Sequence, residues 1–130
     1  MNLQPLNQKN LYELDHYLIE FINLYKNNRL PNKILLSGDK GIGKNTLAYH
    51  LVNFILSQDE KFPYDDKKFE INENNKSFKL TINGSNPNLT LIDASSEKES
   101  INIDQIRDLI SNLNKTSFNN KERFVIIDNI

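Results

Sequence analysis

Residues 38–46 decide the fold, and they read Gly38, Asp39, Lys40, Gly41, Ile42, Gly43, Lys44, Asn45, Thr46. The positions of the glycines and of Lys44 fit G-x-x-x-x-G-K, the pattern of a phosphate-binding loop. Glycines let several backbone N–H groups point at one phosphate, and the helix that follows adds the positive end of its dipole. Lys44 would contact the outer phosphates as a point charge. We therefore predict that these residues bind the phosphates of a nucleotide; a plain glycine turn between a strand and a helix is the alternative.

The segments on both sides of the loop match the arrangement of strand, loop and helix. The apolar run over residues 34–36 predicts a buried strand of a parallel sheet over residues 34–37. After the loop, apolar residues at helical spacing predict a helix over residues 47–56. Before the strand, residues 10–28 show one apolar helical face, and Asn27 and Asn28 end that pattern.

The second half of the chain repeats this alternation. Residues 89–93 and 124–128 predict two further buried strands. Between them a helix is expected to begin near Asn102, with Gln105 at the position of a capping box. Strands that alternate with helices indicate a parallel sheet. The predicted fold class is therefore α/β, of the P-loop NTPase type, with a parallel sheet flanked by helices.

Residues 58–88 differ from the rest because they are rich in acidic residues and asparagine. Two short alternating segments, 69–71 and 78–82, predict a β-hairpin there. We interpret the stretch as an insertion on the surface of the α/β core. Deletion of residues 66–83 is then expected to leave the fold intact, because surface insertions cost little loop entropy.

Two positions depart from the pattern of a nucleotide-hydrolysing site. Such a loop has Ser or Thr after the lysine to hold Mg²⁺, but this chain has Asn45, and Thr46 is turned by about 100° along a helix. Strand 124–128 ends in Asp128, our candidate magnesium ligand, but Asn129 follows, and a neutral amide cannot take a proton from water. We therefore predict no catalytic residue in this chain, and weak or absent binding of ATP or ADP with Mg²⁺.

The composition excludes several classes of protein. The chain has no cysteine, which excludes a cysteine-ligated zinc site, a disulfide scaffold and a thiol nucleophile. A net charge of −1 does not fit a strongly basic nucleic-acid binder. No apolar run approaches the roughly 18 residues of a membrane span, and no secretory signal begins the chain, so we expect a cytoplasmic protein. His16 and His50 lack a second ligand at metal spacing and are interpreted as ordinary surface or half-buried histidines.

Several stretches together resemble the delta prime subunits of bacterial DNA polymerase III, a family of AAA+ clamp-loader subunits. The family reads roughly grLpHawLltGpkGiGKatLA around its loop, followed by HPDl, IsVdqIR and kvviId. The matching stretches here are residues 29–38, 41–48, 86–89 (Asn-Pro-Asn-Leu), 101–107 (Ile-Asn-Ile-Asp-Gln-Ile-Arg) and 124–128. The resemblance covers nearly the whole chain apart from residues 58–85.

This resemblance implies that residues 1–130 are the N-terminal part of a AAA+ P-loop domain. It implies a subunit of the ring that opens the sliding clamp and places it on primed DNA, with the other clamp-loader subunits as partners and the clamp and primer-template DNA reached through the complex. Delta prime is typically the rigid member without ATPase activity, often with Ala after the loop lysine; Asn45 equally lacks the hydroxyl. Some members carry a four-cysteine zinc module, which this chain cannot form.

Two other functions stay open: an active AAA+ motor subunit of the same complex, gamma/tau-like, and a small P-loop nucleotide kinase. By the resemblance, the arginine finger, the lid and the C-terminal oligomerisation domain lie beyond residue 130. The family's sheet places strand two (89–93) beside strand three (124–128), and strand four between strand three and strand one (34–37). Because strand four would also follow residue 130, the sheet is expected to be incomplete and the isolated piece partly molten or aggregated.

Overall fold

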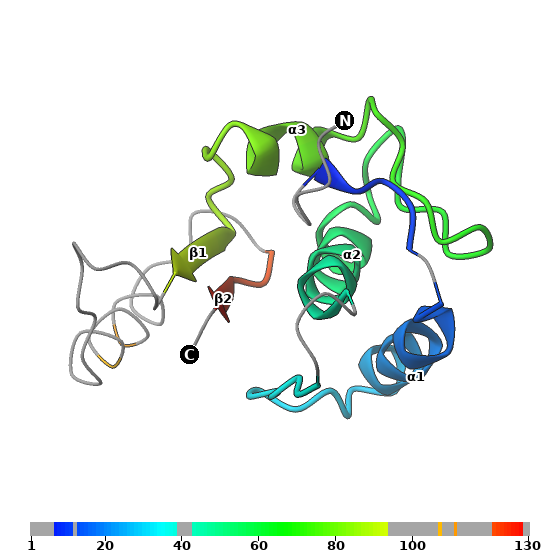
Figure 1. Ribbon diagram of the computed structural model, residues 1–130. Coiled ribbons are helices and arrows are strands. Elements are labelled where there is room, and N and C mark those ends of the chain that lie inside the picture. The colour runs from blue at the N-terminus through cyan, green and yellow to red at the C-terminus, as the bar shows by residue number, and fades with distance from the viewer. Residues whose placement is uncertain are drawn as a thin grey trace. The chain divides into compact units, whose positions relative to one another are not determined.

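The computed structural model describes residues 7–11, 13–38, 43–93, 107, 111 and 121–128. Along them lie the helices α1 (Asp15–Lys26), α2 (Lys44–Leu56) and α3 (Lys76–Ile82) and the strands β1 (Leu89–Asp93) and β2 (Phe124–Asp128) (Figure 1). The chain divides into two compact units. We call Met1–Gly84 the helical unit and Ser85–Ile130 the strand unit, and each is described by itself.

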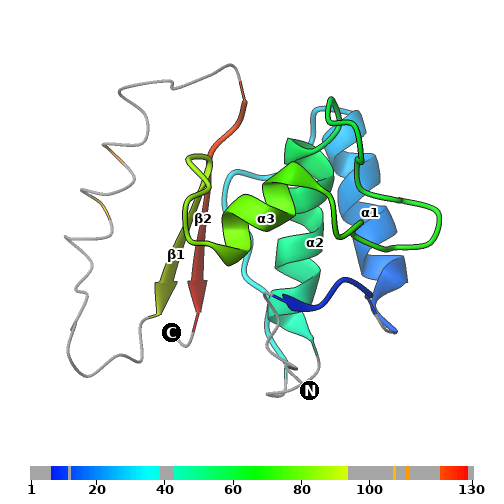
Figure 2. The same ribbon diagram turned by 90° about the horizontal axis from the view of Figure 1, so that it is seen from above.

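In the helical unit α1 lies beside α2, and α3 packs against α2 (Figure 1, Figure 2). α2 buries residues on most of its faces, as a central helix does, whereas α1 buries only the stripe that carries Leu18 and Ile22. The buried apolar residues of the unit are Leu11, Leu18, Ile22, Leu47, Leu51, Val52, Phe54, Ile55, Leu56, Tyr64, Ile71 and Phe78. The helices predicted on both sides of the glycine loop are thus confirmed, and α2 begins earlier than expected, directly at Lys44.

The end of α1 shows why asparagines stop this helix. Asn28 has a φ of 56°, in the left-handed region that Asn tolerates better than most residues. Its N–H donates to the carbonyl of Tyr25 at 3.0 Å, and the N–H of Arg29 donates to the carbonyl of Leu24 at 2.8 Å. These two bonds are those of a Schellman motif, which satisfies the last carbonyls of a helix. The predicted helix end at Asn27 and Asn28 is confirmed.

The predicted buried strand over residues 34–37 is wrong for the structure described here. Residues 33–37 form no strand, and the described sheet consists of β1 and β2 alone. Ile34 is 42% exposed and Leu35 is 82% exposed. An apolar run becomes a buried strand only where neighbouring strands pair with its backbone and cover its side chains, and no strand within the described ranges does so.

The predicted β-hairpin within residues 58–88 is also wrong. Residues 69–71 do pair, but with the N-terminal segment: Ile71 N donates to the carbonyl of Lys9 at 2.8 Å, and Leu11 N to that of Phe69 at 3.2 Å. The second expected strand, 78–82, is helical and belongs to α3.

Asn75 explains why this second segment is a helix. Its side-chain oxygen accepts the N–H of Phe78 at 2.8 Å, which is the N-cap bond that starts α3. Ser77 and Phe78, adjacent residues in the first turn, are both buried. The cap and the packing of these side chains therefore make the segment a helix, although its apolar residues alternate as in a strand. The segment contributes to the core of the helical unit and is not a surface hairpin.

The strand unit contains a two-stranded parallel sheet (Figure 2). Leu89 lies opposite Phe124 at the start, and Asp93 lies opposite Asp128 at the end. Both predicted strands and their parallel pairing are confirmed, and strands two and three are neighbours, as the family resemblance implied. Of the helix expected from Asn102, only Arg107 and Ser111 lie within the described residues, and both are helical.

Asn88 fixes where β2 enters the sheet. Its buried side-chain amide donates to the carbonyl of Glu122 at 3.0 Å, and its own carbonyl accepts the N–H of Phe124 at 2.8 Å. Asn86 supports it by accepting the N–H of Asn88 at 3.0 Å. One asparagine thus sets the register at the beginning of both strands.

Candidate functional site

The candidate phosphate loop is described at its two ends. Gly38, Gly43, Lys44, Asn45 and Thr46 lie within the described residues, and the other candidates, Asp39, Lys40, Gly41 and Ile42, lie outside them. The assignment of all of them to a nucleotide therefore stays a prediction.

Gly43 is the N-cap of α2 and has a φ of 94°, a conformation that side chains rarely adopt. A Cβ at this position would lie 3.3 Å from Cδ1 of Leu14, which precedes α1. The backbone conformation favours glycine here, and a Cβ would also require the Leu14 side chain to move by a few tenths of an ångström. The last glycine of the motif is thus explained by the way that the loop enters α2.

Lys44 is the first residue of α2, and its Nζ donates a hydrogen bond of 2.7 Å to the carbonyl of Gly38. The side chain therefore spans the loop and links its two ends. The described first turn of α2 carries no acidic residue, and Gly43 provides no side-chain cap. The dipole and the N–H groups of this helix end favour an anion rather than a cation.

Asn45 and Thr46 follow Lys44 in the first turn of α2. Thr46 is buried, with 9% of its surface exposed, and it is followed by the buried Leu47. Its burial speaks against Thr46 replacing the missing Ser or Thr hydroxyl at position 45. The donor set at this helix end fits a phosphate group better than it fits Mg²⁺.

His50 anchors the middle of α2 and has no exposed surface. Its Nε2 lies 2.9 Å from the carbonyl oxygen of Gln8, and its Nδ1 lies 2.7 Å from the hydroxyl of Tyr64. A carbonyl can only accept, so Nε2 carries the proton and Nδ1 accepts from Tyr64. Burial lowers the pKa of His50, against a smaller opposing effect of the Gln8 bond. Burial, followed by the charges of Asp65 and Asp66, raises the pKa of Tyr64. The expectation of a surface or half-buried histidine is wrong for His50, because two hydrogen-bond partners let its neutral ring occupy the core.

A buried polar cluster at the far end of α2 was missed by the sequence reasoning. Asn53 and Asn75 exchange amide hydrogen bonds of 3.0 and 3.2 Å, and Ser57 donates to Asn53 at 3.3 Å. Asn75 also donates to the carbonyl of Phe62, and Ser57 accepts the N–H of Tyr64. Among the described residues every fully buried side-chain polar atom has a partner. The sequence did carry a signal for this cluster, because two polar residues, Asn53 and Ser57, stand one helical turn apart among apolar residues.

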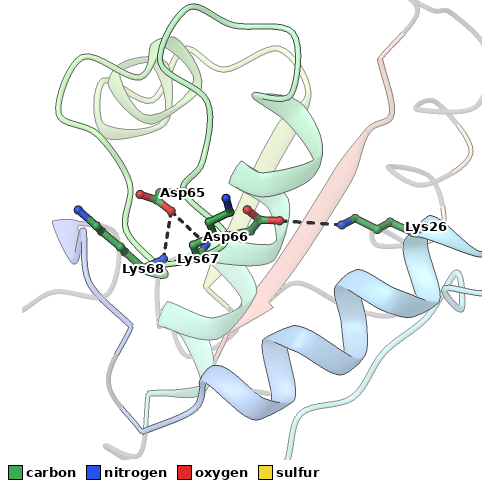
Figure 3. A network of polar contacts seen from close by, with 5 residues as sticks. All are labelled: Lys26, Asp65, Asp66, Lys67 and Lys68. Atoms are coloured by element: carbon green, nitrogen blue, oxygen red, sulfur yellow. Dashed lines mark hydrogen bonds and ion pairs between the residues drawn. The ribbon is translucent and has the colours of Figure 1, made fainter.

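The turn over residues 65–70 is closed by Asp65 (Figure 3). Its Oδ1 accepts the backbone N–H groups of Lys67 and Lys68, each at 3.0 Å. These bonds, that of Lys68 first, hold the pKa of Asp65 below its usual value. Figure 3 also shows Asp66 beside Lys26 of α1, with 3.9 Å between Oδ2 and Nζ. An exposed pair at this distance contributes little stability, so Asp65 is the residue that shapes the turn.

Asp128, the candidate magnesium ligand, ends β2 in the strand unit and is partly buried. The loop candidates belong to the helical unit. The described residues contain no group of three or more His, Cys, Asp or Glu that could hold a metal ion. A magnesium site that includes Asp128 therefore stays a prediction.

None of the helices in the described parts of the chain has both the length and the apolar character needed to span a membrane.

Comparison with known proteins adds one finding. The family model described as "DNA polymerase III, delta subunit" matches residues 14–130, which includes the candidate loop, the 58–88 segment and both strands. No curated protein and no solved structure matches the chain. The small α/β fold is compatible with part of a AAA+ domain. On the extent of this match, the chain belongs to the DNA polymerase III delta-subunit family, which is related to the clamp loader of DNA replication.

Proposed function

We propose that this chain belongs to a delta prime-type clamp-loader subunit that acts as a AAA+ scaffold without hydrolysing ATP. In this role it occupies one position in the hetero-oligomeric ring of the cytoplasmic clamp loader. Its direct partners are the other clamp-loader subunits, and it reaches the sliding clamp and primer-template DNA through the complex. The family match over residues 14–130 supports the setting.

The observation that carries the proposal is the first turn of α2. Lys44 is followed by Asn45, and the next residue along the chain, Thr46, carries its hydroxyl on a buried side chain. A hydrolysing loop needs an accessible hydroxyl on Mg²⁺ directly after the lysine. Asn129, which follows Asp128 in the sequence, adds a second departure because its amide cannot accept a proton from the attacking water.

The first test is hydrolysis by the full-length protein alone, with Lys44→Ala as the matched control. We expect steady-state phosphate release by the unaltered protein to equal that of the control. Nucleotide should bind weakly, and Mg²⁺ should change the affinity little. Release well above the control contradicts the proposal, and if assembly with the clamp loader is kept, it favours the motor-subunit alternative.

The second test is reconstitution of the clamp loader with its remaining subunits. Omission of this protein should abolish clamp loading on primed DNA, whereas Lys44→Ala should leave loading and complex assembly unchanged. A double variant, Asn45→Thr with Asn129→Glu, tests whether the missing hydroxyl at position 45 and the missing carboxylate at position 129 explain the lack of hydrolysis. A complex that assembles and loads clamps without this protein rules out the scaffold role.

A further inference from the structure

The junction between the two units carries a chemically distinctive pair of residues. The helical unit ends at Gly84, and the strand unit begins at Ser85. Asn83 and Gly84 precede the boundary, both are exposed, and Asn83 is the C-cap of α3. The chain is rich in asparagine, but this is its only Asn-Gly pair.

We propose that Asn83 is the main site at which this chain undergoes spontaneous covalent modification, by attack of the Gly84 nitrogen on the Asn83 side-chain amide. The bond between Gly84 N and Asn83 Cγ forms, and the bond between Cγ and Nδ2 breaks. Nδ2 leaves as ammonia, together with the proton that Gly84 N gives up. Water then opens the cyclic imide at either of its carbonyls and leaves an aspartyl or an isoaspartyl residue. The co-reactant is water, and nothing is oxidised or reduced.

The surroundings of Gly84 favour this attack. Gly84 has no Cβ beside its nitrogen, and a Cβ built there would meet nothing within 4 Å. In the closed turn the Gly84 N–H donates to the carbonyl of Thr81 at 3.1 Å, and the Asn83 N–H donates to that of Lys79 at 3.1 Å. The nitrogen must leave the Thr81 carbonyl before it can reach Cγ, so opening of the last turn controls the reaction.

α3 is built so that this last turn opens easily. The helix is anchored at its start, where Asn75, Ser77 and Phe78 are buried, whereas Ile82 at its end is 41% exposed. A helix of 7 residues is well below the length at which isolated helices hold together in water. Fraying at this end breaks the hydrogen bonds that Thr81 and Gly84 make within the last turn, but it leaves the buried residues at the start of the helix in place. Asn53 and Asn75 are the opposite case, because both amides are buried and held by several hydrogen bonds.

The modification changes the junction in two ways. A carboxylate at position 83 places negative charge at the C-terminal end of α3, where the helix dipole disfavours it. An isoaspartyl linkage also inserts an extra main-chain atom before Gly84, which displaces the N–H that bonds the Thr81 carbonyl. Both products therefore weaken the last turn of α3.

The test is incubation of the full-length protein at mildly alkaline pH, with peptide mapping of residues 1–130 that separates aspartyl from isoaspartyl products. Conversion at Asn83 should exceed that at every other asparagine. Gly84→Ala should slow it by about tenfold or more, equivalent to about 1.4 kcal/mol in the barrier. At position 84 the φ of 70° would strain alanine, which favours opening of the last turn of α3 and would by itself speed the reaction. Slower conversion in Gly84→Ala must therefore come from the Cβ that lies beside the attacking nitrogen. Urea should speed conversion of the unaltered chain.

Three results overturn the proposal. They are conversion at another asparagine that equals or exceeds that at Asn83, a rate in Gly84→Ala that matches the unaltered chain, and an unchanged pattern of products in Asn83→Gln. Glutamine carries its amide one carbon further along and so cannot form the five-membered imide.

Discussion

His50 shows how one buried residue couples α2 to the rest of the helical unit. Its ring contacts the carbonyl of Gln8 near the N-terminus and the hydroxyl of Tyr64 in the loop after α2. Both bonds use the neutral ring, with Nε2 as donor and Nδ1 as acceptor. A proton on Nδ1 would remove the acceptor that Tyr64 uses and would place a charge in a fully buried position.

This arrangement predicts that the full-length protein loses stability on mild acidification. The pKa of His50 is lowered from 6.5 in the folded protein, so below 6.5 the unfolded chain binds a proton that the folded chain does not. The free energy of unfolding should therefore fall as the pH drops from 6.5 toward the folded pKa, by up to about 1.4 kcal/mol per pH unit. Urea denaturation at a series of pH values measures this.

The matched pair for this measurement is His50→Gln and His16→Gln. His16 is exposed, so His16→Gln controls for the loss of a histidine outside the core. His50→Gln should show a flatter slope between about pH 5 and 7 than His16→Gln. An equal slope in the unaltered protein and in His50→Gln would show that other groups cause the acid sensitivity.

Asn75 is the second residue on which the helical unit depends. Its amide joins Asn53 of α2, the carbonyl of Phe62 and the N-cap bond to Phe78. Asn75→Ala should destabilise the full-length protein by about 3 kcal/mol, because it leaves buried partners unpaired and removes a cap.

Asn74→Ala is the control for Asn75, because Asn74 is the preceding residue and is exposed. Its effect should lie within about 0.5 kcal/mol of the unaltered protein. If urea denaturation gives similar losses in the free energy of unfolding for the two variants, the buried amide hydrogen bonds contribute no more to stability than an exposed asparagine does.

At the scale of the element, α3 and the turn before it are part of the core. Tyr64 meets Phe54 of α2 edge to face at 6.3 Å, and Ile71 and Phe78 are 5% and 8% exposed. The segment that resembles an insertion in the sequence therefore covers α2. This burial argues against the expectation that residues 66–83 can be deleted without harm, because a deletion would remove both Ile71 and Phe78.

We predict that Phe78→Ala costs about 3–4 kcal/mol of stability, as is usual when a buried aromatic ring is removed. Ile82→Ala, on the same helix but at an exposed position, should cost less than about 1 kcal/mol. Thermal or urea denaturation of the two variants gives the comparison. If both variants behave like the unaltered protein, α3 does not support the core, and the deletion should then be tolerated after all.

At the scale of the whole molecule, apolar surface is left uncovered in both units. Ile34 and Leu35 are exposed in the helical unit, and Leu91 of β1 is 42% exposed in the strand unit. A two-stranded sheet is marginal by itself, and open strand edges are templates for association. We predict that residues 1–130, purified alone, are partly molten or aggregated.

Size-exclusion chromatography and thermal denaturation test this prediction together. Leu35→Glu should increase the monomeric fraction, because it replaces the most exposed of these side chains with a charge. A cooperative thermal transition combined with a monomeric elution volume for the unaltered piece would show that the prediction is wrong.

Local chemistry made much of the fold readable in the sequence. The spacing of apolar residues predicted α1, α2 and both strands, and Asn28 marked the end of α1 because asparagine tolerates the left-handed backbone. Gly43 marked the start of α2 for a similar reason, with a φ of 94°. For the candidate loop, the sequence showed the phosphate-loop pattern. The structure adds that Lys44 contacts Gly38 and that Thr46 is buried.

The sequence by itself therefore determined the elements whose signals are local, and the family to which the chain belongs. Tertiary structure alone decided the rest. Residues 78–82 alternate like a strand but form a helix, because Asn75 caps it and the surface of α2 buries Phe78. Residues 34–36 are apolar like a strand, but Ile34 and Leu35 stay exposed, because pairing depends on a neighbouring strand and not on the segment itself. Contacts between segments distant in sequence leave no periodic signal in either one, so only the folded chain shows them.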